Sequence, residues 1–176
     1  MMKEVFIFPT SFAQQRLWFL DQMSPGDLAY NMPCSVLLRG QLSAKILERS
    51  LNEVVRRHEA LRTTFAVVDG TPVQVIIPAL TLELPVTDLR QLPEGERKAQ
   101  ARHLADQEAQ QSFDLIEGPL IRTRLLRLSE REQLLLLTIH HIVCDGWSLG
   151  VLVKELAALY KAFSAAKKSP LEELPI

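Results

Sequence analysis

The stretch IHHIVCDGWS, residues 139–148, connects a very apolar segment to an amphipathic one. Before it, residues 133–140 (QLLLLTIH) form an apolar run of the length typical of a buried strand. After it, residues 149–163 (LGVLVKELAALYKAF) carry apolar side chains at helical spacing, which predicts an amphipathic helix. In α/β folds, functional groups collect where a strand ends and the next helix begins. We therefore expect the functional site in this loop.

The segments before this loop alternate between helical and strand patterns. Helices are expected at 11–22, 42–58 and 94–112, and strands at 34–39, 61–68, 72–77, 81–86 and 120–128. Ser11 is a suitable N-cap for the first helix, and Asp69-Gly70 between two β-branched runs is typical of a hairpin turn. This order predicts an α/β fold with a mixed, partly antiparallel sheet covered by helices.

Composition narrows the classes of function. Hydrophobic residues make up 47% of the 176 residues, which is enough for a packed core. The formal net charge of -1 gives no reason to propose nucleic acid or an acidic membrane as a partner. No apolar run approaches the roughly 18 residues of a membrane span, and the start lacks the pattern of a secretory signal. Cys34 and Cys144 are too few for a disulfide framework, so we expect reduced thiols in a cytoplasmic protein.

A single histidine near a core is usually a structural residue, but two adjacent histidines followed by Asp-Gly are less easily explained that way. Several other kinds of site are disfavoured in this loop. Neighbouring strand side chains point to opposite faces, so His140 and His141 cannot easily bind one metal ion. The sequence also has no HExxH motif or Cys/His cluster. No GxSxG precedes Ser148, which we expect to be the N-cap of the final helix rather than a nucleophile. Cys144 lies near both histidines, but its spacing implies no thiol–imidazole pair.

The remaining interpretation is a single imidazole that acts on the substrate's own nucleophile. A neutral imidazole, with a reference pKa of about 6.5, can accept a proton at cellular pH. Gly146 permits close approach, and the N–H groups that begin the final helix can steady an oxyanion. These groups suit acyl transfer from a thioester to an amine or hydroxyl. Asp145 either orients His141 or is a structural anion, for which Arg62 is the candidate partner.

The loop and two earlier segments together resemble a known family. HHIVCDG at 140–146 is similar to the HHxxxDG motif of nonribosomal peptide synthetase condensation domains. SFAQQRLWFLDQ at 11–22 resembles the first motif of these domains, RHEALRTTF at 57–65 resembles the second, and YNMP at 30–33 also fits. HHxxxDG alone is shared with other acyltransferases of the chloramphenicol acetyltransferase type, whereas the three motifs in this order are far more specific.

The resemblance implies a chloramphenicol acetyltransferase-like lobe, one of two that enclose the active site of a V-shaped domain. Upstream and downstream peptidyl carrier proteins would deliver a donor acyl thioester and an acceptor aminoacyl thioester on phosphopantetheine arms, with no cofactor or metal bound directly. By position, His141 is the catalytic base or amine-positioning group, and His140 is structural. Asp145 would pair with Arg62, and Gly146 would permit close packing around the pantetheine path.

Length and subtype give further expectations from the resemblance. The continuation DGWS resembles the subtype that joins two L-configured residues, and we expect Trp147 and Ser148 along the substrate channel. Residues 164–176 resemble the start of the segment between the lobes, so residues 1–176 are expected to form the N-terminal lobe alone. Such a lobe should fold without condensing, and the face that the C-terminal lobe covers should invite self-association. The alternatives are a catalytically silent lobe that docks carrier proteins, and an O-acyltransferase or epimerisation relative, which the first two motifs disfavour.

Overall fold

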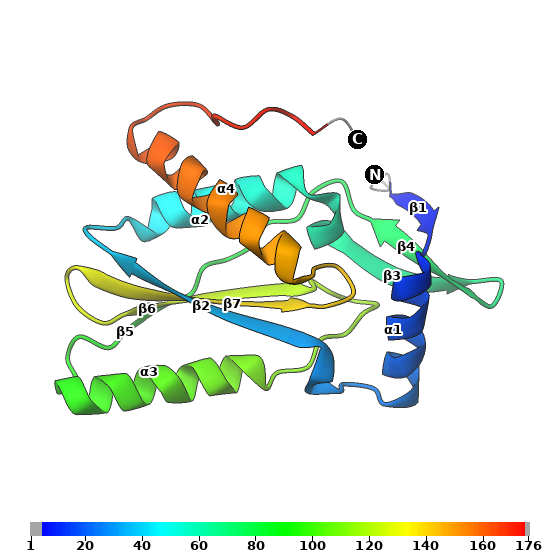
Figure 1. Cartoon of the computed structure of the whole chain (residues 1–176), viewed down its shortest axis with the longest axis horizontal. Helices are drawn as coiled ribbons and strands as arrows, with labels where there is room; N and C mark the ends of the chain where they lie inside the picture. Colours follow the sequence, from blue (N-terminus) through cyan, green and yellow to red (C-terminus); the bar gives the residue numbers. More distant parts are fainter. Residues whose placement is uncertain (1–4, 175–176) are drawn as a thin grey trace.

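The computed structural model describes residues 5–174 and contains two β-sheets with helices packed around them (Figure 1). The strands are β1 (Phe6–Pro9), β2 (Asn31–Arg39), β3 (Thr63–Val68), β4 (Thr71–Ile76), β5 (Val86–Asp88), β6 (Ile121–Arg127) and β7 (Glu132–His140). The helices are α1 (Phe12–Met23), α2 (Ala44–Arg57), α3 (Glu94–Ala109) and α4 (Gly146–Ser164), with short 3-10 helices η1 (Leu28–Tyr30) and η2 (Glu59–Arg62). Across residues 5–174, none of the helices has the length and apolar character that a membrane span requires.

The larger sheet has the strand order β2-β7-β6-β5, which places the very apolar strand β7 in its interior. β7 pairs antiparallel with β2 and β6, whereas β5 pairs parallel with β6, so the predicted mixed sheet is confirmed. Successive side chains of β7 point to opposite faces. Leu135 and Leu137 join a core with α2 and α4, and Leu136 joins a second core with α3. Packing on both faces therefore fixes the strand that leads into the motif loop.

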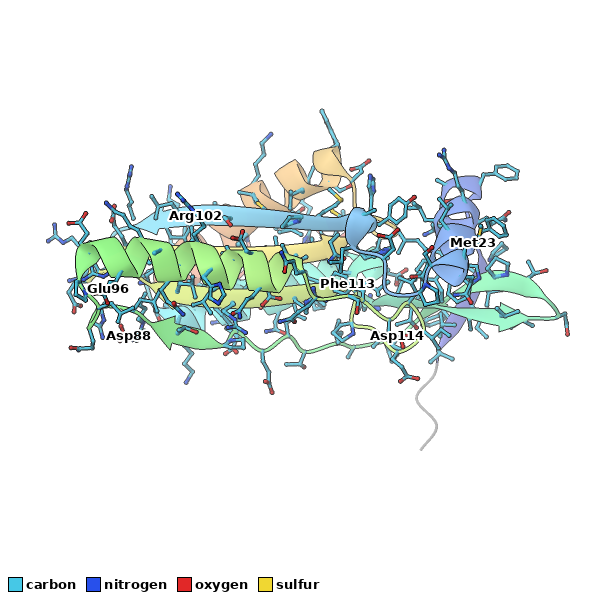
Figure 2. The ribbon with its side chains drawn as sticks, turned by 90° about the horizontal axis from the view of Figure 1, so that it is seen from below. Met23, Asp88, Glu96, Arg102, Phe113 and Asp114 are labelled. Carbon is cyan, nitrogen blue, oxygen red and sulfur yellow. The ribbon has the colours of Figure 1, made fainter. Side chains whose placement is uncertain are left out.

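Helices cover both faces of this sheet. Figure 1 shows α2 and α4 on one face and α3 on the other. Seen from below in Figure 2, α3 lies in front of the sheet and runs along the direction of its strands, with Glu96 and Arg102 on the helix, and Phe113 follows on the way to the β6 strand. The predicted α/β class, a sheet covered by helices, is confirmed by this arrangement.

The smaller sheet has the order β1-β4-β3 and is antiparallel throughout. The predicted hairpin at Asp69-Gly70 is present, and both residues have positive φ (50° and 77°), as a turn of this kind requires. α1 packs beside this sheet through Trp18, which contacts Phe65 of β3 with ring centroids 6.1 Å apart. Ile142, in the motif loop, belongs to the same cluster. The first helix, the small sheet and the motif loop thus share one core.

Among the boundaries that differ from the prediction, two do so because side chains from distant segments take up the backbone hydrogen bonds. The strand expected at 81–86 is absent before Val86, and a short strand occupies Val86–Asp88 instead, since Asn52 on α2 both donates to the Leu82 carbonyl and accepts from its N–H, at 2.9 and 2.8 Å. Helix α3 ends at Ala109 rather than at residue 112. There the Asn31 amide donates to the Ala109 and Gln111 carbonyls, both at 2.8 Å, which replaces helical hydrogen bonds. β1 was not predicted, because a four-residue strand has too little pattern to be recognised.

Candidate active site

The histidine loop, residues 140–145, begins at the last residue of β7 and ends at the N-cap of α4. Its backbone is held by two hydrogen bonds at the start. The His141 N–H donates to the Tyr30 carbonyl at 2.9 Å, and the Val143 N–H donates to the His140 carbonyl at 3.1 Å. The YNMP segment, residues 30–33, lies between the first two motifs and also resembles the family. It therefore contacts the histidine loop directly through Tyr30.

His140 is part of the core. Its side chain is 2% exposed and packs near the rings of Tyr30 and Phe113, at centroid distances of 6.2 and 5.9 Å. Its Nδ1 accepts a hydrogen bond from the Ile142 N–H at 3.2 Å, which requires an unprotonated Nδ1. Burial, with a smaller effect from His141, lowers the pKa of His140 to about 4. The structure thus places a neutral imidazole inside the protein at the position predicted to be structural.

His141, the next residue, is exposed and lies in an open cleft of about 340 Å³. This histidine cleft is formed between the start of α1 and the histidine loop, and it is lined by Ser11, Ala13, Gln14, Leu17, residues 141–145 and Ser148. Within residues 5–174, the His141 imidazole has no side-chain hydrogen bond. The alternation at the end of β7 therefore separates the two histidines, one into the core and one toward a space that a substrate can enter.

Asp145 is the N-cap of α4, so the expectation that Ser148 caps this helix is wrong. Asp145 Oδ1 accepts from both the backbone N–H and the hydroxyl of Ser148, each at 2.7 Å. Ser148 is the third residue of the helix, where its N–H needs an acceptor from outside the helix. These hydrogen bonds lower the pKa of Asp145. One donor of the helix start is therefore occupied by Asp145 and is not free to steady an oxyanion.

The expected Asp145–Arg62 ion pair is also wrong for the residues that the structure describes. Arg62 Nη1 donates to the Ile77 carbonyl at 2.6 Å, and Nη2 lies 3.4 Å from both the Arg56 carbonyl and Glu59 Oε1. The guanidinium thus joins η2 to the end of β4. The physical reason is local competition: nearby carbonyls and Glu59 use the arginine donors, and the helix start uses the aspartate.

The remaining motif residues surround the helix start. Gly146 is the first residue of α4, and a Cβ built on it would meet nothing within 4 Å, so space for a close approach is open. Trp147 is 84% exposed. With His58, Cys144 and other residues it lines a second cavity of about 170 Å³, the tryptophan cavity. Cys144 and Ser148 border both the tryptophan cavity and the histidine cleft.

Gln14 is a site residue that the sequence motifs did not single out. It forms a capping box with Ser11 at the start of α1, and its amide also contacts Gln74 and the Ile142 carbonyl. The Ser-x-x-Gln spacing in the sequence indicates the capping box. The contact with the histidine loop has no local signal, because it joins residues 128 positions apart.

Comparison with known proteins identifies the family. The family model for the condensation domain matches residues 6–176, which is nearly the whole chain. This chain belongs to the condensation domain family. The three motifs quoted from the sequence thus occur in a condensation domain chain, as the resemblance implied.

Curated relatives of this condensation domain chain are much larger proteins. Chondramide synthase of Chondromyces crocatus is 52% identical over 170 residues, which cover 97% of this chain and 4% of that protein. One of the polypeptides of the linear gramicidin synthase of Brevibacillus parabrevis is 50% identical over 168 residues, which cover 96% of this chain and 3% of that polypeptide. The chain therefore spans a small part of the length of each relative.

Solved condensation domains have the same fold as this chain. The starter condensation domain of rhizomide synthetase superposes with a TM-score of 0.84 at 25% identity, covering 95% of this chain and 40% of that one. The first condensation domain of the CDA synthetase gives a TM-score of 0.86 at 23% identity, covering 94% of this chain and 42% of that one. The predicted acetyltransferase-like architecture is thereby confirmed, over less than half of each solved chain.

Proposed function

We propose that this chain is the N-terminal lobe of a condensation domain that joins a donor acyl or peptidyl thioester to the amine of an acceptor aminoacyl thioester. The observation that carries the proposal is the exposed imidazole of His141 in a cleft, directly after the buried His140. An imidazole with no competing protein partner can receive or hold the proton of an attacking amine. Both thioesters would be carried on the phosphopantetheine arms of carrier proteins.

The reaction is an acyl transfer in which bonds and protons balance. The acceptor amine attacks the thioester carbonyl, a C–N bond forms, and the C–S bond to the donor arm breaks. The proton that leaves the nitrogen ends on the released thiol. Because a free α-amine has a reference pKa of about 7.7, much of it is neutral at cellular pH. His141 therefore acts through positioning of the amine as well as through proton transfer.

The surface around the histidine cleft supports a second lobe as the missing wall of the site. Phe12, at the start of α1, is 91% exposed, and Phe19 on the same helix is 62% exposed. Trp147, at the start of α4, is 84% exposed. Large exposed apolar side chains on the two helices that border a cleft are typical of a surface that another protein unit covers. In this proposal the C-terminal lobe of the same domain covers them, and without that lobe the chain self-associates.

A two-lobe domain that contains this chain tests the catalytic role. Two carrier proteins, one loaded with a donor acyl group and one with an amino acid, are mixed with the domain, and the amide product is measured. His141→Ala should lower the rate by on the order of a hundredfold or more. His103→Ala is the matched control, since His103 is an exposed residue of α3, and it should leave the rate unchanged. Unchanged turnover in His141→Ala would reject the proposed role.

The chain alone tests the division into lobes. We expect no amide product from residues 1–176 with the same two carrier proteins, together with concentration-dependent self-association in sedimentation. Amide formation by the chain alone would show that one lobe suffices. A strictly monomeric profile would remove the argument that its apolar surface needs a cover. Carrier-protein binding by a two-lobe domain without turnover would favour a silent docking module.

A further inference from the structure

Gln14 contacts three separate parts of the structure through one side-chain amide. Its Oε1 accepts from the Ser11 N–H at 2.9 Å, which completes the capping box of α1. Its Nε2 donates to Gln74 Oε1 on β4 at 3.0 Å and lies 3.5 Å from the Ile142 carbonyl in the histidine loop. Gln14 also lines the histidine cleft. A residue from the first motif thus reaches the backbone next to His141.

The direction of the Gln14 amide is set by its neighbours. Gln74 Nε2 donates to the Pro9 carbonyl at 3.0 Å, so the oxygen of Gln74 is the atom that faces Gln14. At its other end, Gln14 must present an oxygen to the Ser11 N–H, which leaves its NH₂ group for Gln74 and Ile142. A carboxylate or an apolar side chain cannot make this combination, because it lacks the two donors.

Ile142 is the point at which this network can control His141. The Ile142 N–H donates to His140 Nδ1, and its side chain is 4% exposed in the cluster with Trp18. The carbonyl of Ile142 is the group that the Gln14 amide approaches. Since the His141 imidazole has no side-chain hydrogen bond within residues 5–174, its position depends on the backbone on either side of it. Ile142 is the residue that follows it.

We propose that Gln14 is a positioning residue for His141, which acts by holding the Ile142 carbonyl and so the path of the histidine loop. It contributes no proton and forms no bond to substrate. Its effect on catalysis rests on the proposed function of His141, whereas its effect on the loop does not. The two parts can therefore be tested separately.

Amide hydrogen exchange on the chain itself tests the effect on the loop. Gln14→Met removes the donors and keeps a side chain of similar length. We expect exchange of the Ile142 and Val143 amides to become faster by on the order of tenfold, with β6 and α3 unchanged. Gln15→Met is the control on the same turn of α1, because the Gln15 side chain, within the described residues, forms a hydrogen bond only to the nearby Thr10 carbonyl, at 3.3 Å. Equal exchange in Gln14→Met and the unchanged protein would overturn the proposal.

A second variant keeps the test valid if Gln14→Met fails to fold. Gln14→Glu retains an oxygen for the Ser11 N–H but places a carboxylate against the Ile142 carbonyl and the Gln74 oxygen. It should therefore preserve α1 and still accelerate exchange in the histidine loop. An exchange rate for Ile142 and Val143 equal to that of the unchanged protein would again contradict the proposal.

Kinetics of a two-lobe domain test the effect on catalysis. Gln14→Met should lower kcat by on the order of tenfold, while KM for the acceptor thioester changes by less than about twofold, because a misplaced imidazole affects the reacting geometry. Gln15→Met should change neither constant. If His141→Ala leaves turnover intact while Gln14→Met loosens the loop, the proposed function fails and the loop contact stands. If His141→Ala is inactive and Gln14→Met has normal kcat, the positioning role fails alone.

Discussion

His140 accepts, through Nδ1, a hydrogen bond from the backbone N–H of Ile142, two residues later, at 3.2 Å. This contact can exist only while Nδ1 carries no proton. The buried imidazole thereby shapes the turn that leaves the exposed His141 in the histidine cleft. One histidine of the motif stabilises the loop, and the adjacent one is available for chemistry.

Acidification should destabilise the protein through His140. Its pKa is about 4 when folded, against an ordinary value of about 6.5 when unfolded. As the pH falls from 6.5 to 4, the unfolded chain takes up a proton that the folded protein does not bind, so stability is lost in this window. The loss should be about 3 kcal/mol. Urea unfolding at pH 7.5, 5.5 and 4.5 measures it.

The control for this prediction is a variant that keeps an acceptor but does not titrate. His140→Asn can present its side-chain oxygen to the Ile142 N–H and should show a smaller loss of stability on acidification. His103→Ala, at an exposed position on α3, should keep the slope of the unchanged protein. A slope in His140→Asn as steep as that of the unchanged protein would mean that other groups cause the acid sensitivity.

Asp145 should stabilise α4 independently of Arg62. Asp145→Ala removes the acceptor of the Ser148 N–H and should lower Tm by roughly 2–4 °C, as loss of an N-cap does in a domain of this size. Asp145→Asn, which can still cap, should lose less. Because Arg62 bonds to Ile77, Arg56 and Glu59, the Tm shifts of Asp145→Ala and Arg62→Ala should add in the double variant. A double variant no worse than Arg62→Ala alone would show that the two residues are coupled.

The parts of the structure that the sequence predicts are those with local physical causes. The Ser11 hydroxyl caps α1 by accepting a hydrogen bond from the N–H of Gln14, three residues later. Asp69 and Gly70 adopt the positive φ values of the expected hairpin. The separation of His140 from His141 follows from the two-residue alternation of a strand. Each of these features depends on residues within a few positions of one another.

The parts that the sequence did not predict depend on contacts between distant residues. Asn52 takes the backbone groups of Leu82, 30 residues away, and shortens the strand that the β pattern indicated. Gln14 reaches the Ile142 carbonyl across 128 residues. For Asp145, the family pattern suggested an ion pair with a distant arginine. Ser148, three residues away at the helix start, supplies two hydrogen-bond donors instead, and this arrangement avoids the entropy cost of ordering a long arginine side chain.

Cys144 should be an unreactive thiol near neutral pH, although it borders both the histidine cleft and the tryptophan cavity. Burial, with a smaller effect from Asp145, raises its pKa to about 11, and its S–H donates to the Asp145 carbonyl at 3.4 Å. Only about one molecule in ten thousand then carries the thiolate at pH 7. Alkylation by iodoacetamide, followed by mass spectrometry, should be very slow at pH 7 and accelerate up to pH 10.

The matched variant for this thiol is Cys144→Ser. In a two-lobe domain it should retain amide formation, since no step uses the sulfur. Rapid alkylation of Cys144 at pH 7, or loss of turnover in a folded Cys144→Ser variant, would revive the thiol as a nucleophile.

Glu155 should contribute strongly to stability because it neutralises a buried arginine. On α4, its Oε2 lies 2.8 Å from His58 Nε2 and 3.5 Å from Arg57 Nε, and the Arg57 side chain is only 3% exposed. Removing the carboxylate leaves a buried guanidinium without its counter-ion, although Arg57 keeps its hydrogen bond to the Glu172 carbonyl. Glu155→Ala should therefore lower the free energy of unfolding by about 3 kcal/mol, measured by urea unfolding at pH 7.5.

The exposed pair of Glu94 and Lys98 provides the comparison. Its atoms lie closer, at 2.7 Å, yet about three quarters of each side chain is accessible to solvent. Water screens such a pair, so Glu94→Ala should leave the unfolding midpoint almost unchanged. Glu155→Ala should also free the imidazole of His58, which loses its contact with the carboxylate. NMR detects this as a changed chemical shift of the His58 ring, which borders the tryptophan cavity. Equal, small losses from Glu155→Ala and Glu94→Ala would mean that burial of Arg57 does not strengthen its ion pair.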